Sequence, residues 1–259
     1  MKIPVIEGTI DRRILANFRV DPEAMARVLP APFRPQLIHG YAIGGVCLIR
    51  LTNVRPRCAP FSWGIRSENA AHRFAVEWEA DGQTHQGVYV NRRDTDSCLN
   101  ALAGGRIFPG THHHARFTVE ETDDCFSVEM RAKDGQARMQ VTGSVTDELP
   151  ASSIFSTVQE ASDFFEQGSL GYSASNRAGH FDGLELSCRD WKAEPLQVES
   201  IASSFFDDPQ RFPPGTIEFD CALLMRGTVA RICVAPKISR PEQFYLILKG
   251  TLEWMPVFF

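Results

Sequence analysis

The stretch HRFAVEWEADGQTHQGVYVN, residues 72–91, indicates the fold class most directly. Its first nine residues alternate between apolar and polar side chains, which is typical of a β-strand with one face buried. Asp81-Gly82 is a dipeptide of tight hairpin turns, so residues 85–91 are predicted to return as a second strand. The segment from 125 to 145 repeats this pattern around Asp134-Gly135, and a second hairpin is predicted there.

The rest of the chain also consists mainly of short extended runs, and only a few segments have helix signals. Asp21 with Pro22 predicts the start of a short helix, Asp94 is predicted to cap a helix that ends before Gly104, and Ser156 is predicted to open a third. Further strands are predicted over residues 14–20, 42–54, 183–191, 196–206, 216–225 and 228–234. Two or three helices among about ten strands predict an α+β fold that is mainly antiparallel β, with a curled or closed sheet.

Composition limits the class of protein. The chain has 259 residues, of which 43% are hydrophobic, and a net charge of −5. These values fit a globular protein with a sizeable core, and we expect residues 1–259 to form a single domain because no linker or repeat interrupts them. The acidic balance argues against a nucleic-acid partner. No window approaches the ~20 apolar residues of a membrane helix, so no membrane partner is expected.

Cysteine usage and the N-terminus predict a cytoplasmic protein. The seven cysteines are odd in number and include no C-x-x-C pair, which is unlike a disulfide framework or a structural zinc site. The first residues contain Glu7 and Asp11 and no apolar stretch of signal-peptide length. Phosphate-binding loops, dinucleotide fingerprints and H-E-x-x-H motifs are absent from the sequence, so no cofactor is expected.

Three groups of residues are candidates for a functional site. His112 and His114 would point to one face of a strand, as the anchor of a ligand or as part of a polar strand edge; no third ligand at a suitable spacing supports a metal. Glu68 precedes the first hairpin and is either a general acid/base in a cavity or a loop acid. Arg12 and Arg13 open the first strand and either clamp a carboxylate or form a solvated strand end.

Several motifs together resemble the YqjF-like uncharacterised bacterial family. The opening RILANFRVDPEA, residues 13–24, followed by LPAPF at 29–33, resembles that family's strand, short helix and Leu-Pro step. Gly87-Val88-Tyr89-Val90 is similar to its Gly-Val-Tyr-Phe strand, and GSL at 168–170 and EPLQ at 194–197 are similar to later motifs. The resemblance runs from about residue 10 to 200.

This family in turn resembles, more distantly, the acetoacetate decarboxylase superfamily. That resemblance implies a cone-like antiparallel β-barrel around an apolar cavity, and a catalytic lysine that forms a Schiff base. The decarboxylase lysine pair follows a Tyr-Pro step. Here the matching stretch is Ile107-Phe108-Pro109-Gly110-Thr111, so no lysine stands at those positions.

Other catalytic positions of the decarboxylase are kept only in part. Counting back from Tyr89, Glu68 falls at the place of an active-site glutamate, whereas a second glutamate falls near Gly44 and is lost. The substrate-binding arginine falls near Arg12, one position out of register. The resemblance therefore implies a cavity with an acid and an arginine and without the Schiff-base lysine.

Two functions remain open from the sequence. The first is an enzyme that binds a small organic acid or carbonyl compound, with Glu68 as acid/base and Arg12, Arg13, His112 and His114 as substrate-binding residues. The second is a non-catalytic protein that binds a small hydrophobic ligand in the same cavity. In either case the partner is a small molecule, and a homo-oligomer is compatible with the sequence.

Overall fold

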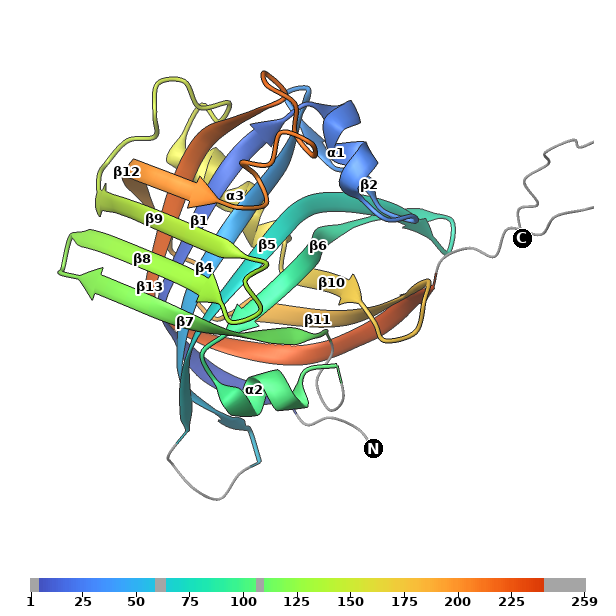
Figure 1. Ribbon diagram of the computed structural model, residues 1–259, viewed down its shortest axis with the longest axis vertical. Coiled ribbons are helices and arrows are strands. Elements are labelled where there is room, and N and C mark those ends of the chain that lie inside the picture. Colours follow the sequence, from blue (N-terminus) through green and yellow to red (C-terminus); the bar gives the residue numbers. More distant parts are fainter. Residues whose placement is uncertain (1–4, 59–63, 106–109, 240–259) are drawn as a thin grey trace, which may run out of the picture.

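The computed structural model describes residues 5–58, 64–105 and 110–239 (Figure 1). Thirteen strands in these residues form one sheet: β1 (Ile6–Val20), β2 (Arg34–Pro35), β3 (Leu37–Ile38), β4 (Tyr41–Pro56), β5 (Ile65–Ala80), β6 (Gln83–Thr95), β7 (His112–Glu121), β8 (Cys125–Ala132), β9 (Arg138–Val145), β10 (Leu170–Ala174), β11 (His180–Cys188), β12 (Glu194–Ser203) and β13 (Ile217–Ser239). The helices of the described residues are α1 (Pro22–Val28), α2 (Cys98–Ala103) and α3 (Val158–Gln167). Mainly antiparallel β with three helices confirms the predicted fold class.

The sheet closes on itself in two rings that share one wall. Strands β13, β1, β4, β5 and β6 pair in this order and form the wall. On one side β7, β8, β9 and β12 connect β6 back to β13, and on the other side β10 and β11 do the same. Only β7 and β10 run parallel to their neighbour β6. Figure 1 shows β7, β8 and β9 in front of the long wall strands.

Both faces of the wall are therefore buried, and each face has its own hydrophobic core. Because side chains alternate along a strand, neighbouring residues belong to different cores. Ile14 and Leu48 pack in the larger core, toward β8 and β9, whereas Leu15 and Cys47 pack in the smaller core with Phe165 of α3. If a wall strand shifted by one residue, the side chains on its two faces would exchange places. The register of strand pairing therefore decides which residues each core contains.

The two predicted hairpins are confirmed. Strands β5 and β6 pair throughout, and Asp81 and Gly82 both have positive φ, at 50° and 71°, as the tight turn requires. Strands β8 and β9 likewise pair on either side of Asp134-Gly135. The first helix also begins as predicted, since the side chain of Asp21 accepts a hydrogen bond from the backbone N–H of Ala24.

The starts predicted for the other two helices are wrong. Asp94 lies inside β6, where its carboxylate accepts a hydrogen bond from the guanidinium of Arg92. The cap of α2 is Ser97. Helix α3 is capped by Thr157, whose hydroxyl accepts from the N–H of Glu160, one residue later than predicted. Glu160 is the acid three residues after Thr157, and its carboxylate accepts a hydrogen bond from the backbone N–H of Ser156, the residue before the cap.

The last predicted pair of strands is one strand. Residues 217–239 form the continuous β13, which pairs with β1, β11 and β12. Gly227, predicted to lie in a break, has a φ of 65° within this strand. A glycine tolerates that conformation without a steric penalty, so the strand bends there and does not end.

Two further features are the length of the helices and the state of the cysteines. None of the helices in the described ranges is both long enough and apolar enough to cross a bilayer. All seven cysteines, which lie within the described ranges, are free thiols.

Candidate functional site

Arg12 and Arg13 lie on opposite faces of the wall. Arg12 is 2% exposed and points toward β7, into the ring of the larger core. Arg13 points to the other face, where it lines a cavity. Consecutive side chains of a strand cannot reach the same group, so the idea that these two arginines clamp one carboxylate is wrong.

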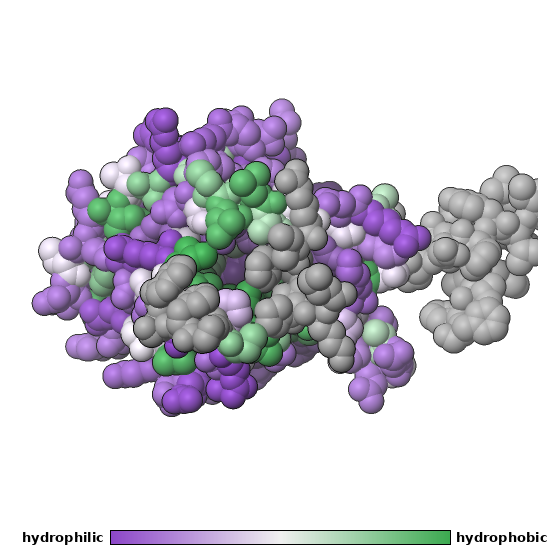
Figure 2. Space-filling view, turned by 90° about the horizontal axis from the view of Figure 1, so that it is seen from below, coloured by the Kyte–Doolittle hydropathy of each residue, from purple (hydrophilic) through white to green (hydrophobic). Residues whose placement is uncertain are grey.

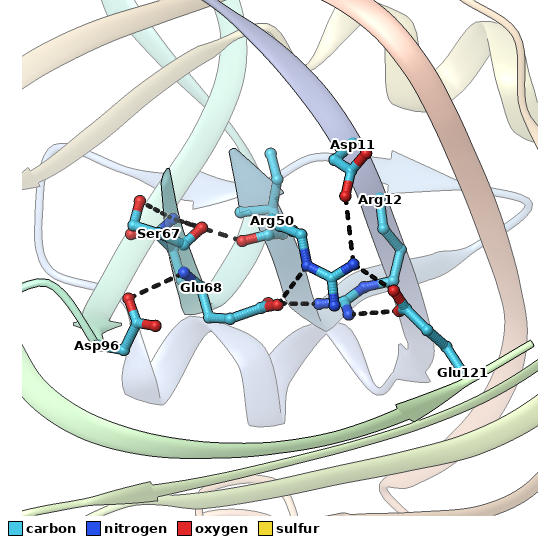
Figure 3. A network of polar contacts seen from close by, with 9 residues as sticks. Asp11, Arg12, Arg50, Ser67, Glu68, Asp96 and Glu121 are labelled. Carbon is cyan, nitrogen blue, oxygen red and sulfur yellow. Dashed lines mark hydrogen bonds and ion pairs between the residues drawn. The ribbon is translucent and has the colours of Figure 1, made fainter. Parts of the chain in front are cut away.

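Arg12 belongs to a buried cluster of charges (Figure 3). Its guanidinium contacts Glu68 at 2.6 Å and Glu121 at 3.0 Å. Arg50, on the neighbouring strand β4, contacts the other carboxylate oxygen of Glu68 at 2.6 Å, and also contacts Glu121 and Asp11. Both oxygens of Glu68 are therefore occupied by arginine donors. The cluster joins three strands of the wall to β7.

The opposite charges of this cluster shift one another's pKa values. Burial alone would lower the pKa of Arg50, but hydrogen bonds to Glu121 and Glu68 outweigh it and raise that pKa. Burial would raise the pKa of Glu121, but hydrogen bonds from Arg50 and Arg12 outweigh it and lower that pKa. The pairing of Arg50 with Glu121 thus favours the charged form of both groups.

Glu68 is not in the cavity, which corrects our expectation. The side chains of Ser67 and Asn69, its neighbours on β5, line the cavity, and Glu68 faces the opposite side. Glu68 was expected just before the first hairpin, in a cavity or in a loop, but it lies within β5, and the alternation along that strand decides its face. It contacts Arg12, which is also outside the cavity. An acid/base role for Glu68 remains an untested prediction.

Arg50 and Glu121 were missed from the sequence. Arg50 is the only charged residue in the apolar run 42–51, and it is 7% exposed. A charge in such a run is a signal of a buried polar site, and the structure shows that its partners are Glu68 and Glu121.

A cavity of about 390 Å³ lies on the other face of the wall. Wall strands, β10, β11 and α2 contribute its lining, which is mainly aliphatic: Ile49, Leu51, Val88, Val90, Leu184 and Leu186 are examples. Leu99 and Ala103 of α2 border its lower end, near the tips of β4 and β5. Figure 2, which views the molecule from this end, shows hydrophobic residues gathered around a hollow.

The described residues that line this aliphatic cavity include the arginines Arg13, Arg55, Arg73 and Arg93. Within the described part of the chain, Arg13, Arg73 and Arg93 form no ion pair, and each of these three is held by neutral groups. Arg13 lies over the ring of Trp191, and Arg73 lies over the ring of Phe165, at 5.7 and 5.0 Å from the centroids.

Polar contacts of these arginines are also with neutral groups. Arg73 donates to the side-chain oxygen of Asn17, and Arg93 donates to the hydroxyl of Ser173 at 3.0 Å. The Nε atoms of Arg13 and Arg73 are buried without a partner. Asp94, the only carboxylate among the described lining residues, is bound by Arg92.

Burial strongly lowers the pKa of two of these guanidinium groups. Desolvation lowers the pKa of Arg73 from 12.5 to about 10, and it lowers the pKa of Arg93 to about 10 as well. Both groups still carry a positive charge at neutral pH. The cavity therefore concentrates positive charge in an apolar surrounding, where an uncompensated charge is costly.

A glycine allows Arg73 to take this position. Asn17, Gly45 and Arg73 are aligned across β1, β4 and β5, so a side chain at the middle position would separate the outer two. A Cβ at Gly45 would lie 2.5 Å from the backbone oxygen of Ala16 and 3.2 Å from Oδ1 of Asn17. Its absence lets the side chain of Arg73 extend over β4 toward β1.

One histidine of the predicted cluster reaches the cavity. His112 lines it, and its Nδ1 lies 3.1 Å from the backbone oxygen of Gly110. Desolvation, together with the charge of Arg93, lowers the pKa of His112 from 6.5 to about 4, so its ring is neutral at pH 7. A proton on Nδ1 satisfies the contact with Gly110 and leaves Nε2 as the proton acceptor.

The other two histidines lie elsewhere. Nε2 of His114 is 3.1 Å from the backbone oxygen of Asp96, and Nδ1 of His113 is 3.3 Å from Asp134. His114 does not line the cavity, although it shares a strand with His112. Over the described ranges, no three His, Cys, Asp or Glu side chains are grouped so that they could hold a metal ion.

None of the lysines in the described ranges lines the cavity: they are Lys133, Lys192 and Lys237. Of the stretch matched to the decarboxylase lysine pair, Ile107-Phe108-Pro109 lies outside the described residues. Gly110 lies within them, and a Cβ there would be 3.1 Å from Nε of Arg93. An arginine of β6 therefore approaches the segment where the resemblance would place the lysines.

Comparisons with known proteins agree on family and fold. A model of the family DUF2071, described as an uncharacterized conserved protein (COG2071), matches residues 8–210. An acetoacetate decarboxylase-like enzyme from Sphingomonas wittichii RW1 is similar in structure, with a TM-score of 0.58, 13% identity, and coverage of 92% of this chain and 94% of that one. No curated protein sequence matches the chain.

Two further solved structures are similar. Acetoacetate decarboxylase from Legionella pneumophila has a TM-score of 0.56 at 10% identity, covering 89% of this chain and 87% of that one. The enduracididine biosynthesis enzyme MppR, complexed with pyruvate, has a TM-score of 0.52 at 12% identity, covering 92% and 91%. These matches confirm the acetoacetate decarboxylase-like fold, and at such identities they carry the fold alone.

The charge cluster gives a prediction about stability. Glu68→Gln leaves Arg12 and Arg50 without a shared carboxylate in a buried position, so we expect a loss of about 3–5 kcal/mol in the free energy of unfolding, measured with urea. Glu79→Gln, which removes an exposed carboxylate of the same strand, is the control and should change it by no more than ~0.5 kcal/mol. If Glu68→Gln leaves stability intact and abolishes a ligand-dependent activity, the cluster is catalytic and not structural.

Proposed function

The chain belongs to the DUF2071 family and has the acetoacetate decarboxylase-like fold, and we propose that it binds a small organic acid in the aliphatic cavity. The observation that carries this proposal is the group of arginines Arg13, Arg73 and Arg93, which face the cavity without a carboxylate partner in the described ranges. The charge cluster on the opposite face shows how the same wall buries arginines when the protein supplies their counter-charge itself. On the cavity side the described residues supply no such counter-charge, and in this proposal the ligand carries it.

The aliphatic residues of the cavity lining determine the character of the rest of the ligand. Aliphatic side chains cover most of the cavity, so the acid carries an apolar portion that replaces water against them. A purely hydrophobic ligand, the alternative from the sequence, fits the aliphatic lining but leaves Arg73 and Arg93 without a counter-charge in a drier surrounding. The arginines therefore favour an anion with an apolar body over a neutral hydrophobic molecule.

A second candidate function is acid–base catalysis on the bound acid, with His112 as the base. Its ring is neutral at pH 7, its Nδ1 is oriented by Gly110, and it lies in the same cavity as Arg93. A neutral imidazole with a fixed tautomer can accept a proton at Nε2. In this candidate Arg93 stabilises negative charge that develops on the substrate, and no lysine imine takes part.

The role of the arginines is tested by calorimetric titration with hexanoate and with 1-hexanol, which has the same chain length without the charge. We expect hexanoate to bind and hexanol to bind far more weakly, because only the carboxylate compensates the buried guanidinium groups. Arg73→Gln should weaken hexanoate about 10- to 100-fold, the value of a hydrogen bond to a charged group. Arg138→Gln, on the exposed side of β9, is the control. Equal binding of hexanol and hexanoate would contradict the proposal.

The absence of imine chemistry has its own test. We expect no covalent adduct when the protein is incubated with acetoacetate, treated with borohydride and weighed by mass spectrometry. The reason is that Lys133, Lys192 and Lys237 lie outside the cavity and that Gly110 and Thr111 replace the lysine pair. A stoichiometric adduct on any lysine would contradict this prediction and return a decarboxylase-type mechanism to first place.

A further inference from the structure

The cationic groups of the cavity are divided between two ends. Arg13 starts on β1 and Arg93 on β6, and β4 and β5 lie between these strands. Neighbouring strands are ~4.8 Å apart, so the two backbones are separated by about 14 Å measured along the curved wall. The cavity spans this width, since residues of all four strands line it.

Arg73 belongs to the Arg13 end although it starts on β5. Its side chain extends over Gly45 and reaches Asn17 of β1, so its guanidinium lies toward β1. The charge of Arg13 contributes to lowering the pKa of Arg73, in addition to desolvation, which agrees with this proximity. Arg13 and Arg73 also line a smaller recess together, next to Phe165. They form the first end of the cavity.

Arg93 forms the second end with His112. The two residues are directly paired between β6 and β7. The charge of Arg93 contributes to the lowered pKa of His112, after desolvation. Nε of Arg93 donates a hydrogen bond to the hydroxyl of Ser173. The terminal nitrogens of Arg93 are therefore its remaining donors.

The surface between the two ends is small and apolar. Cys47 and Ala71 are paired in the middle of the wall, and Ile49 and Val90 border them. Short side chains at the centre leave room for a ligand to lie across the wall from one end to the other. The sequence of groups along this path is cationic, apolar and cationic.

We propose that the ligand is a short aliphatic dicarboxylate that spans the cavity, with one carboxylate at Arg13 and Arg73 and the other at Arg93. This inference rests on the proposed binding of an organic acid and specifies its class. A monocarboxylate compensates only one end and leaves the other end desolvated without a counter-charge. A dicarboxylate compensates both ends, and its alkyl chain contacts the apolar middle.

The experiment compares matched ligands that differ in one group. Succinate, glutarate, adipate and pimelate are titrated beside butyrate, valerate, hexanoate and heptanoate, by calorimetry at pH 7.5, where both carboxylates are ionised. We expect the best dicarboxylate to bind about 10- to 100-fold more tightly than the monocarboxylate of equal length, because it gains a second charged contact. We also expect one chain length to be preferred, since the two ends are at a fixed separation.

The variant Arg93→Gln tests whether Arg93 binds the second carboxylate. In Arg93→Gln the advantage of the dicarboxylate should disappear, while the affinity for the monocarboxylate that binds at Arg13 and Arg73 should stay within about threefold of the unmodified protein. Arg93→Lys, which keeps the charge, should retain part of the advantage and serves if Arg93→Gln does not fold. Arg138→Gln is the control and should keep the full advantage.

The possible failures are distinct. If monocarboxylates bind as tightly as dicarboxylates, or if Arg93→Gln weakens both series equally, the dicarboxylate inference is wrong and the proposed binding of organic acids stands. If neither series binds to the unmodified protein, the proposed function itself is wrong.

Discussion

Alternation of side chains across a wall that is buried on both faces is the constraint on which this structure depends. Five strands are shared by two closed rings, so alternation assigns the buried residues of the wall to one of two interiors, and a bulge such as the one between Ile10 and Arg12 resets the assignment. Arg12 and Arg13 show the consequence, because one step along β1 separates a charge cluster from a cavity. By the same constraint, the groups that contact a buried charge come from the face on which that charge lies.

The two faces differ in the groups that contact their buried charges. On one face Arg12 and Arg50 are compensated by Glu68 and Glu121, and the resulting cluster ties the wall to β7 (Figure 3). On the other face, in the described part of the chain, the arginines are held by aromatic rings, an amide and a hydroxyl, which orient them without neutralising them. Orienting a charge while leaving it uncompensated costs folding energy, and a site that binds an anion recovers this energy on binding.

Local signals in the sequence were sufficient for the two hairpins and the first helix, and long-range pairings decided the rest. Asp81-Gly82 and Asp21 act within a few residues, so the hairpin and the first helix could be predicted. The cap at Asp94 could not, because Arg92 takes that carboxylate inside a strand. Glu68 was assigned to the cavity by counting along a family resemblance, and the count cannot tell the two faces of a strand apart. Arg73 carries no motif, and its importance arises from a glycine on the neighbouring strand.

The central claim is that the protein leaves the positive charge of the cavity to be neutralised by a small organic acid. Native mass spectrometry of freshly purified, tag-free protein, followed by release and weighing of whatever it carries, tests this claim most directly. The account predicts a bound small acid on the unmodified protein, released at low pH, and its loss in Arg73→Gln with Arg138→Gln unchanged. A neutral lipid or other uncharged molecule in the cavity, equally retained by Arg73→Gln, would contradict it.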